Sequence, residues 1–344
     1  MCSVFCSSIS SKSISFQKEE EEEKKNKITP TSSCSCLKKI PSWQVFSPLQ
    51  WMLFHPPSPS TYESSDSGIY KLKPGIKKNK SSNSSSSIVK IRSPIYYFYL
   101  SNTDPVLFPE NRNRIFTSKR LYFFFHGNSC DIGTMKSFLG LFMEIHNYKY
   151  SYIETHVVAM EYSGYGCLKD SYFDIKRMCE SSEDLLSYFL YNKIPSLEPR
   201  DVFIVGQSIG TGIATYLTCH FSQTLEKEDK KEKQLGGMIL ISPFTSLKEL
   251  ISELVPPTWN WITKICYERF NNSDHVKQIS IPSLFIHGEK DTLIPSSHST
   301  KLSALSPSRN RQLIVKPKTN HNNFKAGELT DHILEFVHDF HKNY

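Results

Sequence analysis

The pentapeptide Gly206-Gln207-Ser208-Ile209-Gly210 has the residue types and spacing of a sharp turn that presents a nucleophilic serine. It directly follows an apolar run at 202–205, which predicts a strand, and it opens a stretch that predicts a helix. Small residues must flank Ser208, because the turn that lifts its hydroxyl above a sheet is tight. A serine hydroxyl is a poor nucleophile without a base, so the motif predicts a partner histidine elsewhere in the chain.

Asp291 and His321 are the predicted partners of Ser208. At a serine site of this strand–turn–helix type, the acid and then the histidine follow the serine along the chain. Asp291 lies just past the apolar run 284–287, and His321 lies past a further predicted strand at 312–315. The His321 imidazole can accept the serine proton, while Asp291 would fix its tautomer and stabilise the imidazolium.

Other titratable residues could compete for these roles. His298 follows Asp291 closely and is expected to begin the next helix, which favours a structural role. Glu289 is the alternative acid, but it stands where the chain is still turning after the strand. The remaining candidates are expected on the solvated side of the last helix: His332, His338 and His341.

Two backbone N–H groups are predicted to stabilise the oxyanion that forms during acyl transfer. The first belongs to Ile209, at the start of the helix that follows Ser208. The second is assigned to Asn128 in His126-Gly127-Asn128-Ser129, with Ser129 as the alternative. A Gly-containing loop after a strand can also be only a tight turn.

Strand and helix patterns alternate along the region that holds these residues. This alternation predicts an α/β fold with a mostly parallel sheet covered by helices on both faces. The predicted strands are 121–125, 157–162, 202–205, 238–242, 284–287 and 312–315. The predicted helices are 174–192, 209–221 and 331–340. An apolar stretch at 250–270 could be a small acyl-binding cap or an ordinary packed helix.

Composition separates residues 1–87 from residues 88–344. The first part is rich in Ser, Lys and Glu, and we expect it to be largely disordered, with an apolar and proline-rich island at 43–62. The second part is long enough to form one α/β domain. The net charge of +7 is mixed in sign and shows no basic stripe interleaved with aromatics, so nucleic acid is not an expected partner.

The nine cysteines include no Cys-x-x-Cys pair, and a charged run stands where a secretory signal would need an apolar stretch. These features predict an intracellular, cytoplasmic protein. Cysteines near basic and apolar residues in a flexible segment can be S-acylated, which could hold the protein peripherally on a membrane. The candidates are Cys34 and Cys36, with Cys2 and Cys6 further away.

Five motifs in order resemble the α/β-hydrolase domain-containing protein 17 family of membrane-bound depalmitoylases. They are His126-Gly127-Asn128-Ser129-Cys130-Asp131-Ile132-Gly133, Tyr162-Ser163-Gly164-Tyr165-Gly166, Gly206-Gln207-Ser208-Ile209-Gly210-Thr211, Ser242-Pro243-Phe244-Thr245-Ser246 and His287-Gly288 with Asp291. The segment 54–62 is similar to the proline-rich entry segment of that family, in which a cysteine cluster just upstream of this segment is S-acylated. Glu161 stands where the family usually has Asp.

The resemblance implies an α/β-hydrolase fold and hydrolysis of acyl thioesters or esters through an acyl-enzyme. Removal of palmitate from proteins is one reaction of this kind. The expected substrate is an acylated protein or a lipid ester, and no metal or cofactor is expected. Alternatives are a lysophospholipase or carboxylesterase, a serine peptidase, and a non-catalytic adaptor that binds lipidated proteins. Nothing in the sequence predicts the oligomeric state.

Overall fold

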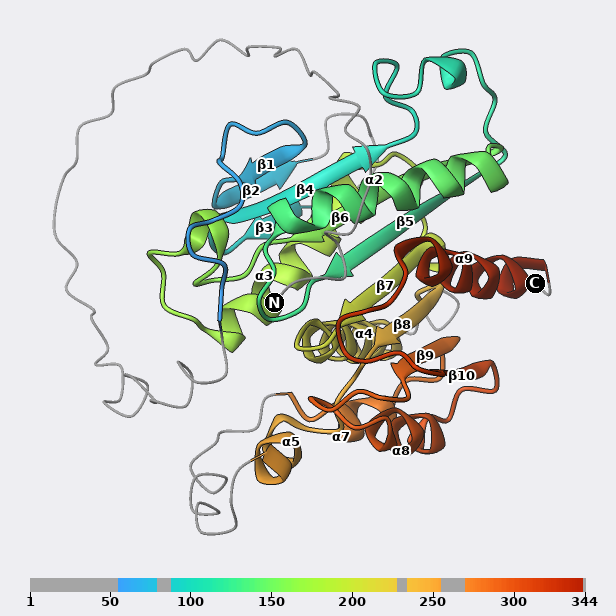
Figure 1. Ribbon diagram of the computed structural model, residues 1–344. Helices are drawn as coiled ribbons and strands as arrows, with labels where there is room; N and C mark the ends of the chain where they lie inside the picture. The colour runs from blue at the N-terminus through green and yellow to red at the C-terminus, as the bar shows by residue number, and fades with distance from the viewer. Residues whose placement is uncertain (1–54, 79–87, 228–233, 255–269, 343–344) are drawn as a thin grey trace, which may run out of the picture. The chain divides into compact units, whose positions relative to one another are not determined.

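An eight-stranded sheet in the order β1-β4-β6-β5-β7-β8-β9-β10 lies at the centre of the computed structural model (Figure 1). The structure describes residues 55–78, 88–227, 234–254 and 270–342. The strands of this sheet are β1 (Ile69–Leu72), β4 (Ile95–Ser101), β5 (Ser118–Phe125), β6 (Ile153–Met160), β7 (Val202–Gln207), β8 (Gly237–Ile241), β9 (Ser283–Gly288) and β10 (Arg311–Lys316). Strands β5 to β10 run parallel, whereas β4 is antiparallel to β6 and β1 is antiparallel to β4.

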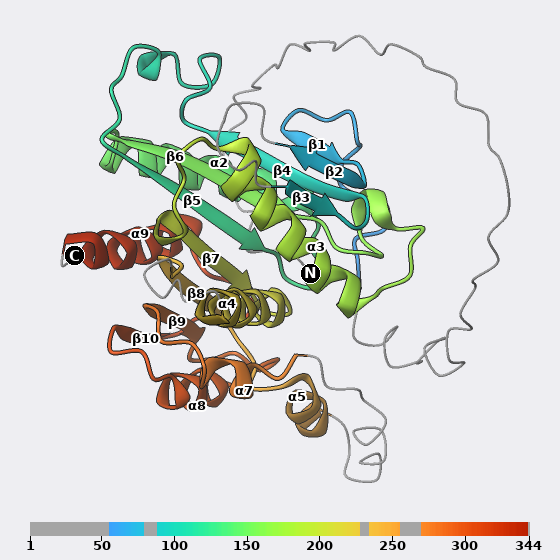
Figure 2. The ribbon, with the colours of Figure 1, turned by 180° about the vertical axis from the view of Figure 1, so that it is seen from behind.

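Helices cover both faces of the sheet. Helices α2 and α9 pack together over one face (Figure 1), and α3, α4 and α8 lie over the other (Figure 2). The helices are α2 (Ile132–Lys149), α3 (Ile175–Tyr188), α4 (Gly210–Lys227), α5 (Leu247–Leu254), α7 (Asn272–Val276), α8 (Ser297–Leu305) and α9 (Ala326–Lys342). Short helical turns are η2 (Pro109–Asn111), η3 (Gly166–Leu168), η4 (Phe189–Lys193) and η5 (Pro199–Asp201), and β2 (Gly75–Lys78) pairs with β3 (Ile88–Ile91).

The central strands are continuous apolar runs because a parallel sheet with two covered faces buries both sides of each strand. All six residues of β7 are buried, and the segment Leu121–Phe125 of β5 is buried on both faces. The aromatic rings of β5 meet α2, with Tyr122 against Phe142 at 4.9 Å between ring centroids. This packing fixes the carboxyl ends of β5 and β7 beside each other.

The predicted α/β-hydrolase fold is confirmed, and each of the six predicted strands and three predicted helices has a counterpart in the structure. The elements that were not predicted include β4, next to β6 in the sheet, and the long helix α2. The folded unit also begins further upstream than residue 88, since β1 and β2 belong to the same unit as the sheet. Each of these strands has only four residues, and both lie in a segment that is rich in polar residues, so neither shows an apolar pattern long enough to predict a strand. The apolar part of the predicted island (43–54) and residues 255–269 of the predicted cap lie outside the described residues.

Candidate active site

Ser208 lies on a sharp turn between β7 and α4, and its backbone has a positive φ of 51°. This conformation is uncommon for a residue with a side chain and is held by close packing on both sides. A Cβ atom at Gly206 would lie 2.7 Å from the Cβ of Ala214, and one at Gly210 would lie 2.7 Å from the carbonyl oxygen of His126. The sequence therefore needs glycine at both positions to place the serine hydroxyl at the carboxyl edge of the sheet.

His321 lies between Ser208 and Asp291 and contacts both. Its Nε2 atom lies 3.0 Å from the Oγ atom of Ser208, and its Nδ1 atom lies 2.6 Å from the Oδ2 atom of Asp291. Because a carboxylate can only accept, Nδ1–H donates to Asp291 and leaves Nε2 to accept the serine proton. The three side chains are buried, with 6 to 8% of each residue exposed. The arrangement can activate a serine for attack on a carbonyl.

The Asp291 carboxylate is held by donors on both of its oxygens. Oδ1 accepts hydrogen bonds from the N–H groups of Leu293 and Ile294, each at 2.9 Å. His287 Nε2 lies 3.3 Å from Oδ2, although it makes a shorter contact of 2.8 Å to the carbonyl oxygen of Ile294. Burial alone would raise the pKa of Asp291, but the contacts with His287 and His321 outweigh it and hold the pKa well below its usual range. Asp291 is therefore ionised in the folded protein at neutral pH.

The competing residues lie elsewhere. His298 is fully buried, with Nδ1 2.8 Å from the hydroxyl of Thr245 and Nε2 3.0 Å from Glu253, which is a structural environment. Glu289 accepts a hydrogen bond from the backbone N–H of Lys318 and does not contact His321. The other histidines lie on α9: His332, His338 and His341.

Ile209 and Asn128 flank the serine from two different turns. Among the residues that the structure describes, none accepts a hydrogen bond from the Ile209 N–H, so this group remains available to an oxyanion. The loop that carries Asn128 passes close to the nucleophile, because a Cβ atom at Gly127 would lie 3.7 Å from the Cβ of Ser208. The Asn128 side chain is fixed by Tyr165, whose hydroxyl donates to its Oδ1 atom at 2.7 Å. Ser129, the alternative donor, lies on the same loop.

A buried polar cluster behind this loop was not predicted as part of the site. The hydroxyl of Tyr162 donates to the carbonyl oxygen of His126 at 2.8 Å, and the two rings stack with centroids 3.9 Å apart. Nε2 of His126 lies 3.0 Å from Oε1 of Glu161, and both side chains are fully buried. His126 and Tyr162 belong to the two motifs at 126–133 and 162–166, and Glu161 directly precedes the second. The motifs alone do not predict that these three side chains contact one another.

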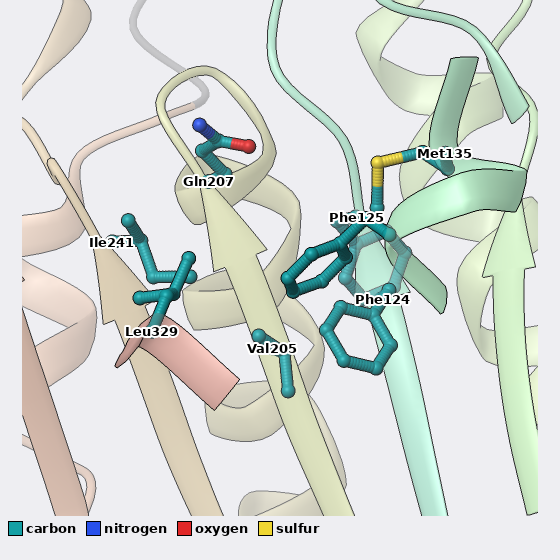
Figure 3. A pocket seen from close by; sticks show the side chains of 8 residues that line it. Phe124, Phe125, Met135, Val205, Gln207, Ile241 and Leu329 are labelled. Carbon is teal, nitrogen blue, oxygen red and sulfur yellow. The ribbon is translucent and has the colours of Figure 1, made fainter. Parts of the chain in front are cut away.

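A small cavity of about 10 Å³ lies beneath the turn, between the sheet and the helices α2 and α9 (Figure 3). Figure 3 shows Gln207 at its upper end, above Val205 and between Ile241 and Phe125. The Gln207 Oε1 atom is buried and meets no donor within the described part of the chain. The volume suits a single water molecule and is far too small for an acyl chain.

The described residues form neither a metal-binding cluster nor a membrane-spanning helix. Residues 55–78, 88–227, 234–254 and 270–342 contain no cluster of three or more His, Cys, Asp or Glu side chains that could hold a metal ion. In the same ranges, no helix is long and apolar enough to cross a membrane. The predicted acylation sites Cys2, Cys6, Cys34 and Cys36 lie outside these ranges.

Comparisons with known proteins give matches among serine hydrolases and α/β-hydrolases. A family model described as serine hydrolase (FSH1) matches residues 176–321. Protein bem46 of Schizosaccharomyces pombe is 27% identical over 224 residues, which cover 65% of this chain and 67% of that protein. Human alpha/beta hydrolase domain-containing protein 17B is 29% identical over 192 residues, which cover 54% of each chain, so the match spans about half the length of that relative.

A solved structure with a similar arrangement is Est1E from Butyrivibrio proteoclasticus, at 13% identity and a TM-score of 0.49, with 77% of this chain and 98% of that chain covered. The residues that the family model matches include the serine turn, the acid and the histidine. The chain has the α/β-hydrolase fold and is similar in sequence to serine hydrolases, among them alpha/beta hydrolase domain-containing protein 17B.

Proposed function

We propose that the protein hydrolyses acyl thioesters or esters through an acyl-enzyme on Ser208, with His321 as the base and Asp291 as the residue that orients it. The observation that carries this proposal is the continuous hydrogen-bond chain from Asp291 through His321 to the Ser208 hydroxyl. A non-catalytic adaptor would have no need to keep such a chain at the carboxyl edge of the sheet.

The first half of the reaction forms the acyl-enzyme. Ser208 Oγ attacks the acyl carbonyl while its proton moves to Nε2 of His321, and the resulting oxyanion is placed to accept hydrogen bonds from the N–H groups of Ile209 and Asn128. The tetrahedral intermediate then collapses, and the carbon–sulfur or carbon–oxygen bond breaks. The leaving thiolate or alkoxide takes the proton from His321 and departs as a thiol or alcohol.

The second half regenerates the enzyme. A water molecule gives a proton to His321 and attacks the ester carbonyl on Ser208, through a second oxyanion in the same site. Collapse breaks the bond between the acyl carbon and Oγ, and His321 returns the proton to Ser208. The products are a carboxylic acid and free enzyme, so water is the only co-reactant.

Protein cysteines that carry a long acyl chain are the substrate class that we favour, because the sequence motifs resemble those of the depalmitoylase family. Lipid esters such as lysophospholipids are the second candidate, since the same serine chemistry cleaves both bonds. Thioesters place lower demands on the general acid than amides do, because a thiolate leaves readily. This difference places peptides last among the candidate substrates.

The test compares three substrates at equal acyl-chain length: an S-palmitoylated peptide, the matching O-palmitoyl serine peptide and a palmitoyl lysophospholipid. Released palmitate is measured for the wild type and for Ser208→Ala. The proposal expects palmitate release from the thioester peptide at a rate that Ser208→Ala loses. Cleavage of the lysophospholipid alone would reassign the protein as a lipase, and hydrolysis that survives in Ser208→Ala would remove Ser208 as nucleophile.

Membrane association through acylated cysteines is part of the same proposal. One acyl chain gives marginal, reversible binding, so two acylated cysteines or one plus nearby basic residues are needed. Fractionation of the wild type beside a variant with Cys2, Cys6, Cys34 and Cys36 all changed to Ser provides the test. We expect the wild type in the membrane pellet with a hydroxylamine-sensitive acyl label, and the variant in the supernatant. A wild type that stays in the supernatant without label contradicts the proposal.

A further inference from the structure

The segment just before β1 is anchored to the first turn of α2, beside the loop that carries Asn128 (Figure 1). The backbone N–H of Thr61 donates to Oδ2 of Asp131 at 2.8 Å, and the Thr61 hydroxyl donates to the other carboxylate oxygen. Asp131 is fully buried and caps α2 through the N–H of Thr134. A salt bridge of 2.9 Å between Asp66 and Lys136 adds a second attachment. Asp131 thus joins the segment to the helix that starts directly after the predicted oxyanion loop.

Tyr62 fills a close-fitting site between the two motifs at 126–133 and 162–166. A Cβ atom at Gly133 would lie 2.8 Å from the Cβ of Tyr62, and one at Gly166 would lie 2.5 Å from its ring, so neither position can carry a larger residue. The Tyr62 hydroxyl accepts a hydrogen bond from the N–H of Cys167 at 3.1 Å. Burial raises the pKa of Tyr62, and the Glu161 carboxylate raises it further, so the hydroxyl keeps its proton. The Tyr62 hydroxyl and the Glu161 carboxylate both lie against Gly166.

Glu161 lies between Tyr62 and the residues that pack near the nucleophile. Its carboxylate accepts from the backbone N–H groups of Tyr162 at 3.0 Å and Ile132 at 3.3 Å, and Nε2 of His126 lies 3.0 Å away. The other ring nitrogen of His126 lies 3.0 Å from the carbonyl oxygen of Gly127, the residue that packs against Ser208. Every member of the chain is buried, and water cannot replace a lost contact without a rearrangement.

We propose that Thr61 and Tyr62 are positioning residues that hold the 127–131 loop in the geometry required to stabilise the oxyanion. The inference rests on the proposed serine-hydrolase function and assigns part of that function to a segment before the sheet. Neither side chain touches the reacting atoms: Thr61 acts through Asp131, and Tyr62 acts through Glu161 and His126. Detaching this segment would leave the triad in place and loosen the oxyanion site.

The test uses Tyr62→Phe, which removes only the hydroxyl, and Thr61→Val, which removes one donor. Thr61→Ser restores that donor, and Tyr70→Phe is the matched control because Tyr70 is 44% exposed on β1. For each full-length variant, kcat and KM are measured with a p-nitrophenyl ester, and Ki is measured for a trifluoromethyl ketone, whose serine adduct carries an oxyanion. Thermal unfolding is recorded in parallel.

We expect Tyr62→Phe and Thr61→Val to lower kcat by about tenfold with little change in KM, because small misplacements at a reacting centre are costly. Ki should rise by the same factor, since the inhibitor reports the oxyanion site. Thr61→Ser and Tyr70→Phe should match the wild type. An active wild type whose Tyr62 and Thr61 variants change only their unfolding temperature overturns this inference alone. A wild type that cleaves no ester and binds no inhibitor overturns the proposed function as well.

Discussion

Nε2 of His321 lies 3.0 Å from the Oγ atom of Ser208, although the two residues are 113 positions apart in the chain. The contact arises because β7 and β10 run parallel in one sheet, so the loops that follow them emerge at the same edge. Asp291 reaches the same edge from the end of β9, which pairs directly with β10. The sheet therefore assembles three residues that no local segment could bring together.

The two buried histidines of this region should behave differently on substitution. His321→Ala removes the imidazole that contacts Ser208, and we expect kcat to fall by about 10⁴ to 10⁶. His298→Ala removes contacts to Thr245 and Glu253 and should lower thermal stability while most of the activity remains. Both variants are assayed with one p-nitrophenyl ester, and unfolding temperatures are compared. An inactive His298→Ala beside an active His321→Ala would show that the wrong histidine has been assigned.

Asp291→Asn should reduce kcat by about 10⁴ and leave KM nearly unchanged. The amide cannot hold the His321 tautomer as a carboxylate does, and it loses the charge that stabilises the imidazolium. Glu289→Gln is the matched control, because Glu289 contacts the backbone of Lys318 and not His321. The low pKa of Asp291 means that the wild type keeps this charge through the mildly acidic range. Equal losses in the two variants would argue against a specific role for Asp291.

Acid should destabilise the protein through His146, a buried residue of α2. Burial, with a smaller contribution from Arg120, lowers the pKa of His146 to about 3, from a usual value of 6.5. Between these values the unfolded chain binds a proton that the folded protein does not, so the free energy of unfolding falls as the pH falls. The contribution is at most about 1.4 kcal/mol per pH unit.

His146→Gln removes this proton-binding group and keeps a polar side chain near Thr155. Urea unfolding of the wild type, His146→Gln and the control His220→Gln is measured at several pH values below neutral. We expect the stability of His146→Gln to decline less steeply than that of the other two proteins, because His220 is half exposed. Parallel stability profiles for all three proteins would contradict the assignment.

Much of the site could be predicted from the sequence because its signals are local. The turn at Ser208 needs small neighbours and a strand before it, and these are readable in a few residues. Asp291 and His321 followed from chain order and from the strands that precede them. Helix α2 could also have been predicted, since its buried residues recur at helical spacing: Ile132, Met135, Phe138, Leu139, Phe142, Met143 and His146.

The remaining features depend on contacts between distant segments. Strands β1 and β2 are short and carry charged residues, so they have no periodic apolar pattern of their own. The contact of Thr61 with Asp131 spans 70 positions, and that of Tyr62 with Cys167 spans 105. The local sequence shows glycine at positions 133 and 166 but not the reason for it. The structure gives the reason, because Thr61 and Tyr62 occupy the space that a side chain at either position would need.

The central claim, that Ser208 is the nucleophile, is tested most directly by identifying the residue that reacts with a fluorophosphonate. This reagent forms a stable covalent adduct with an activated serine. Intact-mass analysis of the full-length protein and peptide mapping are carried out on the wild type, on Ser208→Ala and on Ser283→Ala, a buried serine at the start of β9. The account predicts one adduct per chain, located on Ser208, in the wild type and in Ser283→Ala, and none in Ser208→Ala. An unmodified wild type, or an adduct that persists in Ser208→Ala, would contradict it.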